Sequence, residues 1–413
     1  MGQLLDHLFD NRLPVRFEFW DGSTAGPADT TEVLAVRSPD AIRRLMWAPG
    51  ELGLARAYVA GDLDIRGDVF ALLRALKDSR AAERLNPSEV VEFARVAGRV
   101  GATKGPLPPP DEEARPRGRR HSKHRDAQAI THHYDVSNEF YRLFLGPSMV
   151  YSCARFGDAD MSLEQAQASK LDMICRKLGL HEQGPKRLLD VGCGWGSMVI
   201  HAAQHYGATA VGVTISPAQA EWARRRVREA GLEDRVQIRL QDYRDLAGER
   251  FDAVSSIGMF EHVGSAHMAE YFTSLRGVLG PHGRLLNHAI SSVGGSVVSP
   301  RSFIGRYVFP DGELIDVADV LLAMQAAGFE VRDVESLREH YARTLRHWVA
   351  NLDAAWPECV RHAGQGRARV WRLYMAASAL AFDDGDISLH QVLGVVPDEH
   401  GVTRMPASRS GWS

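Results

Sequence analysis

A glycine-rich loop near the middle of the chain combines residue types and a spacing that suit ligand binding. Asp190, Gly192, Gly194 and Gly196 stand at alternate positions after an apolar run, and a helical pattern begins directly behind them. Alternate glycines let the backbone turn tightly and approach a ligand without Cβ clashes, and the start of a helix offers free N–H donors. The spacing is G-x-G-x-G and differs from the G-x-G-x-x-G of dinucleotide binders. The loop therefore predicts a small-ligand site, with an NAD site and a plain strand-to-helix turn as alternatives.

This loop resembles the first motif of class I methyltransferases, which implies that it binds S-adenosylmethionine. In that family an acid usually ends the second strand and binds the ribose, whereas this chain has Thr214 and Ser216 there. A hydroxyl and an amide can bind ribose in place of an acid, so Thr214 and Gln219 are candidates, with Ser216 beside them. Asp242 and Tyr243 end the third predicted strand, where such enzymes usually contact adenine. Ordinary packing is the alternative explanation for Thr214 and Tyr243.

Five further segments resemble one particular family of methyltransferases. They are H-Y-D-V-S-N at 133–138, M-V-Y-S-C at 149–153, G-M-F-E-H-V-G at 258–264, Y-V-F-P-D-G at 307–312 and H-Y-A-R-T-L at 340–345. Together they resemble the cyclopropane fatty acyl phospholipid synthases and the related mycolic acid modifying enzymes over roughly residues 128–395. The resemblance implies an enzyme that transfers a one-carbon unit from S-adenosylmethionine to the double bond of an unsaturated fatty acyl chain.

The resemblance also implies where the base of such a reaction is held. In the family this base is a bound bicarbonate, held by the backbone at the cysteine of Y-S-C and by four residues of other motifs. Carried over by motif, the five residues here are Cys153, Glu261, His288, Ile290 and Tyr341. Tyr151 and Ser152, which precede the cysteine, are expected at the cofactor.

The chemistry explains why such residues would gather. A cis alkene is a weak nucleophile, so the enzyme must chiefly align its π bond with the sulfonium methyl in a dry pocket. Methyl transfer leaves a carbocation, which aromatic faces stabilise, and the candidates are Tyr134, Phe260, Tyr307 and Tyr341. A base must then remove a proton. Direct ring closure gives a cyclopropane, whereas a hydride shift beforehand leads to a methylene branch.

Each candidate of the base group also has a plain structural explanation. Cys153 fits a small buried residue with an inert thiol, and Glu261 fits a helix N-terminal carboxylate. His288 fits a core histidine and Tyr341 a rim aromatic. Around His288 the chain reads L-N-H-A-I where the family commonly has L-L-H-T-I. We favour a cyclopropane product. The alternatives are a methylene-branched product, a small-molecule N- or O-methyltransferase, and a non-catalytic lipid- or cofactor-binding protein.

The elements that must position these residues follow from length and pattern. A chain of 413 residues exceeds the roughly 250–300 residues of one core, so we expect more than one domain. We predict a small α+β domain over residues 1–100, an exposed basic, Pro-rich linker over 101–127, and a catalytic domain with lipid-binding insertions over 128–413. In the last part strand and helix patterns alternate, which predicts an α/β fold with the Rossmann-like doubly wound sheet of class I methyltransferases.

Composition and charge limit the partners. The formal charge of −3 gives no reason to expect nucleic acid, and four dispersed cysteines without a C-x-x-C pair predict neither a metal site nor a disulfide framework. No apolar run reaches the roughly 18 residues of a membrane span. The basic tract from Arg115 to Arg125 predicts attraction to an anionic membrane surface, with a solvated linker as the alternative. We therefore expect a cytoplasmic enzyme, peripheral on the inner face of the membrane, that acts on unsaturated phospholipid acyl chains. Homo-oligomerisation is left open.

Overall fold

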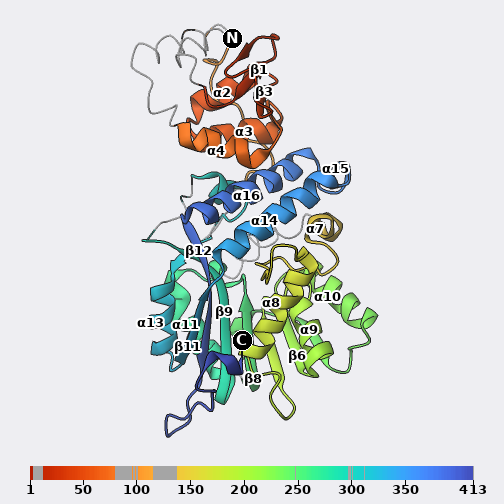
Figure 1. Ribbon diagram of the computed structural model, residues 1–413, viewed down its shortest axis with the longest axis vertical. Coiled ribbons are helices and arrows are strands. Elements are labelled where there is room, and N and C mark those ends of the chain that lie inside the picture. Colours follow the sequence, from red (N-terminus) through yellow and green to blue (C-terminus); the bar gives the residue numbers. More distant parts are fainter. Residues whose placement is uncertain are drawn as a thin grey trace. The chain divides into compact units, whose positions relative to one another are not determined.

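The computed structural model divides the chain into two compact units (Figure 1). The residues that it describes are 1–2, 13–79, 95, 98, 101–114, 137–246, 248–295, 299, 301–310 and 312–412. The first unit comprises Met1–Arg115, Ser299–Pro310 and Trp356–Leu380. The second comprises Pro116–Val298, Asp311–Ala355 and Ala381–Ser413. Within the described part of the chain, no helix is both long and apolar enough to cross a bilayer.

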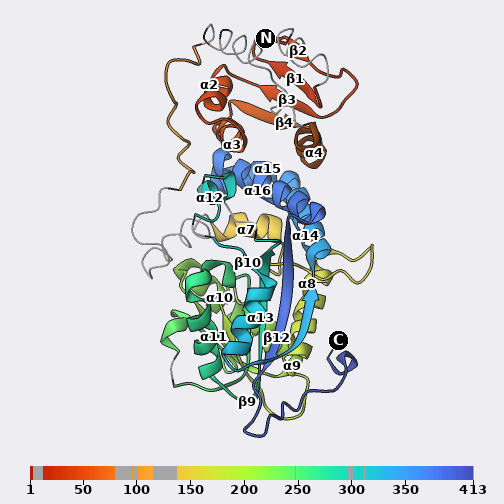
Figure 2. The ribbon, with the colours of Figure 1, turned by 90° about the vertical axis from the view of Figure 1, so that its left-hand side faces the viewer.

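The first unit contains a four-stranded sheet in the order β2-β1-β3-β4. Its strands are β1 (Arg16–Phe19), β2 (Thr24–Ala25), β3 (Val33–Val36) and β4 (Leu63–Arg66). Helices α3 and α4 lie along one face of this sheet (Figure 2). The helices in the described part of the unit are α2 (Asp40–Trp47), α3 (Glu51–Ala60), α4 (Val69–Ser79), α12 (Phe303–Tyr307), α15 (Trp356–Ala363) and most of α16 (Gln365–Asp384).

The composition of this unit differs from the domain boundaries expected from the sequence. Two later segments, Ser299–Pro310 and Trp356–Leu380, belong to it, and buried polar contacts join each to the first part of the chain: the Tyr307 hydroxyl donates to Glu113 at 3.2 Å, and Arg369 Nη1 donates to the carbonyl of Tyr58 at 3.0 Å. The described part of the expected linker is also held in place, since Arg43 Nε donates to the carbonyl of Gly105 at 2.6 Å. The rest of that tract, 115–127, lies outside the described residues. The separate linker therefore stays a prediction.

The second unit is built on an eight-stranded sheet in which β11-β12-β9-β8-β5-β6-β7 are neighbours and β10 pairs with β9. Its strands are β5 (Arg187–Val191), β6 (Thr209–Thr214), β7 (Val236–Leu240), β8 (Phe251–Ile257), β9 (Leu279–Ser292), β10 (Ile315–Asp316), β11 (Glu330–Ser336) and β12 (Ile387–Val395). Strands β7, β6, β5, β8 and β9 run parallel, and β12 pairs antiparallel with both β9 and β11. The predicted doubly wound α/β sheet is confirmed.

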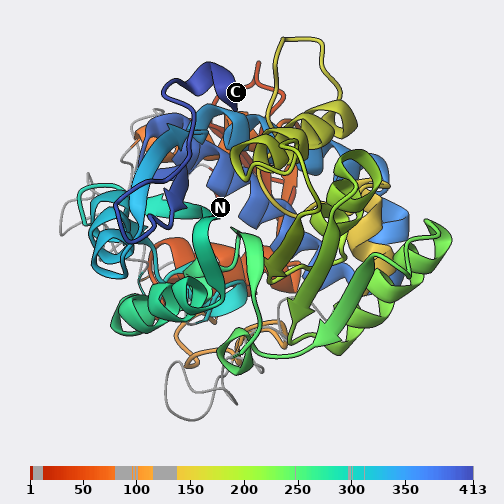
Figure 3. The ribbon, with the colours of Figure 1, turned by 90° about the horizontal axis from the view of Figure 1, so that it is seen from below.

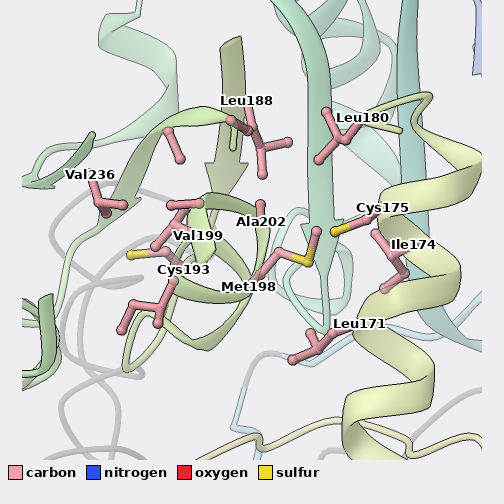
Figure 4. Packing of buried hydrophobic residues seen from close by; sticks show 14 of the residues in the cluster. Leu171, Ile174, Cys175, Leu180, Leu188, Cys193, Met198, Val199, Ala202 and Val236 are labelled. Atoms are coloured by element: carbon pink, nitrogen blue, oxygen red, sulfur yellow. The ribbon is translucent and has the colours of Figure 1, made fainter. Parts of the chain in front are cut away.

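Helices cover both faces of this sheet (Figure 3). On one face, Leu188 and Ala253 of neighbouring strands share an apolar cluster with α8, α9 and α10. There the α8 side chains Ile174 and Cys175 face Met198 of α9 (Figure 4). The other face packs against α11 and α13. The helices of the unit are α7 (Asn138–Leu145), α8 (Leu163–Lys177), α9 (Ser197–Tyr206), α10 (Pro217–Glu229), α11 (Met268–Gly277), α13 (Val317–Ala326) and α14 (Arg338–Ala354).

Helix α8 carries two lysines, Lys170 and Lys177, into this buried layer. It begins with a capping box, in which Ser162 accepts from the backbone of Gln165 and the Gln165 side chain accepts from the backbone of Ser162. Lys170 and Lys177 are seven residues apart and therefore lie on the same side of the helix as Ile174. The apolar stripe of α8 thus places both ammonium groups toward the sheet, where they are fully or almost fully buried.

Candidate active site

A pocket opens where the parallel strands β5, β6, β7 and β8 end, which is the usual ligand position in a doubly wound sheet. It holds about 1200 Å³ of empty space, part of it open to solvent. Nine of the residues predicted for the cofactor line this pocket: Tyr151, Ser152, Asp190, Gly192, Gly194, Thr214, Gln219, Asp242 and Tyr243. The structure therefore brings together segments that are up to about ninety residues apart in the sequence.

Two residues predicted for the cofactor do not line the pocket. Gly196 precedes α9 with φ of 83°, and a Cβ atom there would lie 3.2 Å from the Cβ of Ala223, so this glycine permits close packing of α9 and α10. Ser216 precedes α10, and its hydroxyl accepts from the backbone N–H of Gln219 at 3.2 Å. Both residues shape the elements behind the pocket.

The glycine loop is held by its own backbone. The N–H groups of Gly192 and Cys193 both donate to the carbonyl of Val213 at 2.9 Å, which ties the loop to the end of β6. Gly194 has φ of 52°, and an added Cβ atom would meet no protein atom within 4 Å. Since Gly194 lines the pocket, this open side is available to a ligand.

A buried carboxylate and a buried ammonium lie at the pocket. Asp190 accepts from the Ser255 hydroxyl at 2.7 Å, and burial raises the pKa of its carboxyl to about 6. Lys170 donates to the Ser152 hydroxyl at 2.7 Å, and burial lowers the pKa of its ammonium group to about 8. The sequence analysis missed Lys170, although a lysine on the apolar side of a helical pattern was the signal that could have found it.

The candidates for ribose and adenine are already organised by one another. The Thr214 hydroxyl donates to Gln219 Oε1 at 2.9 Å. Arg244 binds both oxygens of Asp242, with Nε to Oδ1 at 2.8 Å and Nη2 to Oδ2 at 2.6 Å. The ring of Tyr243 packs edge-on against Tyr271, with centroids 5.1 Å apart. These contacts fix the rim of the pocket without a ligand.

Glu261 lies directly beyond β8, in the short 3-10 helix η3 (Phe260–His262). Its Oε1 accepts from the backbone N–H of Ile290 at 2.8 Å, which is possible because β8 pairs with β9 only as far as Ile257 opposite His288. Among the described residues, none forms a hydrogen bond with the buried Oε2 atom. Burial raises the pKa of this carboxyl to about 7. Ile290, one of the residues predicted to hold bicarbonate, therefore has its backbone N–H engaged by Glu261.

His288 lies on β9, opposite Gln391 of β12. Its Nδ1 is 3.1 Å from Gln391 Nε2, while Nε2 of the ring is buried and has no hydrogen-bond partner within the described part of the chain. Burial lowers the pKa of the imidazole well below its ordinary value, so the ring is neutral. Asn287 and Ala289, where the sequence departs from the family, alternate with His288 along the strand and so face the other side of the sheet.

Cys153 and Tyr341 meet at the start of α14. The Cys153 thiol donates to the carbonyl of Leu337 at 3.6 Å, and the backbone N–H of Tyr341 donates to the same carbonyl at 3.1 Å. Leu337 in turn donates to Leu389, which pairs with Ile290 across β12 and β9. Burial raises the pKa of the Cys153 thiol far above its ordinary value, so the sulfur is not a thiolate.

The five predicted residues of the base group are thus linked through β9, β12 and the start of α14. They do not line the pocket at the ends of β5, β6, β7 and β8 themselves; we call it the cofactor pocket because nine residues predicted for the cofactor line it. Their neighbours do, because Ser152 precedes Cys153, His262 follows Glu261, and Ile257 pairs with His288. The base group therefore adjoins the cofactor pocket.

A row of aromatic rings, most of which the sequence analysis missed, runs from the pocket to Tyr341. Trp195 and Tyr151 line the pocket, and each packs against Tyr141, with ring centroids 4.9 and 5.6 Å apart. Tyr151 also packs against Trp348 at 5.2 Å, and Trp348 packs against Tyr341 at 6.1 Å. The row connects the pocket to Tyr341 through ring contacts alone.

The other aromatic candidates are placed elsewhere or not described. Phe260 is buried among Tyr271 and Phe272, with centroid distances of 5.5 and 5.4 Å. Tyr307 belongs to the first unit. Tyr134 and the rest of the opening motif at 133–136 lie outside the described residues, as do the basic residues of the tract from Arg115 to Arg125.

Comparison with known proteins agrees with this architecture. A family model described as mycolic acid cyclopropane synthetase matches residues 121–392. A probable fatty acid methyltransferase from Mycobacterium tuberculosis is 47% identical over 411 residues, covering 97% of this chain and 95% of that protein. The cyclopropane-fatty-acyl-phospholipid synthase of Escherichia coli (strain K12) is 36% identical over 374 residues, covering 89% of this chain and 88% of that protein.

Solved structures point the same way. The cyclopropane synthase MmaA2 from Mycobacterium tuberculosis superposes with a TM-score of 0.62 at 32% identity, over 66% of this chain and 98% of that chain. The mycolic acid cyclopropane synthase CmaA1, in complex with SAH and CTAB, gives a TM-score of 0.61 at 32% identity, over 65% of this chain and 98% of that chain. Fold, pocket and relatives together define an S-adenosylmethionine-dependent methyltransferase. More narrowly, the chain belongs to the mycolic acid cyclopropane synthetase family, whose members modify fatty acyl chains.

Proposed function

We propose that this enzyme transfers the methyl group of S-adenosylmethionine to the cis double bond of an unsaturated phospholipid acyl chain, and that bound bicarbonate accepts the proton, giving a cyclopropane. The observation that carries the proposal is the pair of buried polar atoms beside the cofactor pocket, Glu261 Oε2 and His288 Nε2, for which the described residues provide no partner. The E. coli relative, named for a cyclopropane product on a phospholipid, supports the same substrate class.

The residues present fit a small hydrogen-bonding anion. Glu261 Oε2 can accept from an anion hydroxyl, and His288 Nε2–H can donate to an anion oxygen. The Tyr341 hydroxyl and the backbone at Cys153 are the further donors that we propose. Bound bicarbonate would supply a base of moderate strength, so the protein would need no basic side chain at the reacting carbon.

The protein's own part in the reaction is alignment and exclusion of water. The pocket residues hold the cofactor so that its methyl faces the alkene, which replaces chemical activation of a weak nucleophile. As the new C–C bond forms, the sulfur keeps the electron pair of the broken bond and positive charge appears on the acyl chain. The row of aromatic rings then stabilises that charge. Glu261 and His288 orient the base toward the added methyl, whose C–H electron pair closes the ring as the proton leaves.

The product can be tested directly in a bacterial host that lacks its own cyclopropane synthase. Cells fed oleate and methyl-deuterated methionine are expected to make a phospholipid acyl chain heavier than oleate by one CD2 group. The modified chain should survive ozonolysis, because a cyclopropane contains no double bond. Lipids are analysed by mass spectrometry before and after ozonolysis, and a host that expresses Gly194→Val serves as the matched control.

The outcomes separate the alternatives. Cleavage of the labelled chain to a ketone would identify the methylene-branched product instead. Absence of any labelled acyl chain, in cells that contain folded protein, would favour a small-molecule N- or O-methyltransferase or a non-catalytic binding protein.

The raised pKa of Glu261 predicts a pH dependence. Only the ionised carboxylate can accept from the anion hydroxyl at Oε2, and burial moves the pKa of this group up to about 7. The rate should therefore rise as the pH increases through about 7 and level off above it. The measurement is kcat/KM against pH with the bicarbonate ion concentration held constant. A rate that falls, or stays flat, for about one unit on either side of neutrality would contradict the assigned role.

We further propose that the enzyme works in the cytoplasm, peripherally at the inner face of the membrane. The support for this is the charge of the tract from Arg115 to Arg125, since each Lys or Arg near an anionic surface contributes roughly 1 kcal/mol.

A further inference from the structure

We propose that Gln391 and Lys177 are positioning residues that hold His288 in the Nε2–H tautomer, so that the imidazole donates a hydrogen bond to the anion that serves as base. The role of the anion rests on the function proposed above, whereas the tautomer rests on hydrogen-bond geometry alone.

Lys177 determines which way the Gln391 amide faces. Its side chain is only 3% exposed, and its ammonium group lies 2.9 Å from Asp333 Oδ2 and 3.0 Å from Gln391 Oε1, with Glu335 as a third partner. An ammonium group has donors only, so the atom of Gln391 that faces it must be the carbonyl oxygen. The reverse orientation would place two donors against each other.

The orientation of Gln391 then determines the proton on His288. With Oε1 committed to Lys177, the Gln391 NH2 group lies 3.1 Å from His288 Nδ1 and donates to it. Nδ1 must therefore offer a lone pair. A neutral imidazole with an unprotonated Nδ1 carries its proton on Nε2.

The Nε2–H donor is directed away from this network. It is buried without a partner in the part of the chain that the structure describes. His288 pairs with Ile257 of β8 and with Gln391 of β12, and paired residues of neighbouring strands face the same side of a sheet. Ile257 lines the cofactor pocket, so the donor lies on the pocket's side of the sheet. A buried donor in that position calls for an acceptor from a ligand.

The network is anchored at its far end as well. Asp333, which binds Lys177, is also paired with Arg409 at 2.5 Å. The partners come from α8, β9, β11, β12 and the C-terminal segment, so the amide is held by several elements and not by one loop. The arrangement fixes the tautomer before any ligand binds.

Nitrogen-15 NMR of labelled histidine tests the tautomer. In the wild-type protein, long-range correlation spectra should show His288 protonated at Nε2 and bare at Nδ1, with its signals identified by their loss in His288→Asn. In Gln391→Glu, one carboxylate oxygen stays with Lys177 and the other becomes an acceptor for His288. The proton should therefore move to Nδ1, while turnover falls about 10²–10³-fold, the usual effect of losing one well-placed donor.

Glu335→Gln is the matched control. Glu335 is 31% exposed, and Lys177 keeps both Asp333 and Gln391 as partners in this variant. The wild-type tautomer and most of the turnover should remain. S-adenosylmethionine affinity, measured by calorimetry, should be unchanged in both variants.

The outcomes are separable. A wild-type spectrum with the proton on Nδ1 overturns the inference without any variant, so poor folding of Gln391→Glu cannot leave it untested. A proton that stays on Nε2 in folded Gln391→Glu also overturns it, and so does an altered tautomer with normal turnover. If the tautomers behave as expected but wild-type turnover ignores bicarbonate, the positioning roles of Lys177 and Gln391 stand and the proposed base fails.

Discussion

Glu261→Gln is expected to lower turnover about 10²–10³-fold while leaving S-adenosylmethionine affinity unchanged. The structure fixes how the new amide would sit. Oε1 accepts from the backbone of Ile290, so the glutamine carbonyl will take that place and the NH2 group will replace Oε2. An acceptor beside the proposed base thereby becomes a donor, although the shape of the side chain is almost the same. Turnover is measured from labelled acyl chains and affinity by calorimetry.

Bicarbonate supplies the control for this experiment. Depletion of bicarbonate from the buffer should depress wild-type activity, and its return should restore it. Added bicarbonate should rescue Tyr341→Phe better than Glu261→Gln, because the tyrosine lends one donor whereas the carboxylate sets the orientation of the anion. Wild-type activity that ignores bicarbonate, together with near-normal turnover in both variants, would falsify the proposed base.

Gly194→Val should weaken S-adenosylmethionine binding by at least about 100-fold, which corresponds to roughly 2.7 kcal/mol. Gly194 lines the pocket, and an added Cβ atom there meets no protein atom within 4 Å. A valine side chain would therefore occupy space that the ligand needs. The backbone φ of 52° at Gly194 also disfavours a β-branched residue at this position. Calorimetry measures the affinity, and circular dichroism confirms that the variant is folded.

Gly231→Val is a control that separates the loss of ligand space from the effect of backbone strain. Gly231 has φ of 65° and likewise no atom within 4 Å of an added Cβ, but it follows α10 and does not line the pocket. The Gly231→Val variant introduces the same kind of backbone strain as Gly194→Val. It should therefore lose a similar amount of stability but keep its affinity for the cofactor. Unchanged affinity in folded Gly194→Val would remove the loop from the cofactor site.

Most of the described residues that the sequence analysis placed at the cofactor do line one pocket, so this grouping could be predicted from the sequence. Glycines such as Gly192 and Gly194 are needed because the backbone turns there and leaves room for a ligand. This requirement involves only neighbouring residues, so it is visible as a short motif in the sequence. The alternation of strands and helices predicted the sheet for the same reason. Gly196 and Ser216 belong to the same local motifs, yet they pack or cap helices, because neighbouring positions of one turn face different ways.

The base side could be predicted only where a family motif marked it. Gln391 lies 103 residues from His288, and the two meet because β12 enters antiparallel between β9 and β11. The residue pattern of neither strand predicts this pairing register. Lys170 and Lys177 were overlooked because charged residues are expected at the surface. The domain boundaries differ from expectation for a related reason, since late segments such as 356–380 belong to the first unit.

The late entry of β12 has a consequence for how the protein is made. Among the described residues, those that line the cofactor pocket lie between Met149 and His267, whereas β12 (Ile387–Val395) is synthesised after all of them. A truncated product that stops before β12 would contain the whole ligand-binding half of the sheet but would leave one side of β9 unpaired. An open apolar strand edge is a template for pairing with other chains. A premature stop in this gene would therefore yield a chain that aggregates or is degraded, and not a stable enzyme that merely lacks its base.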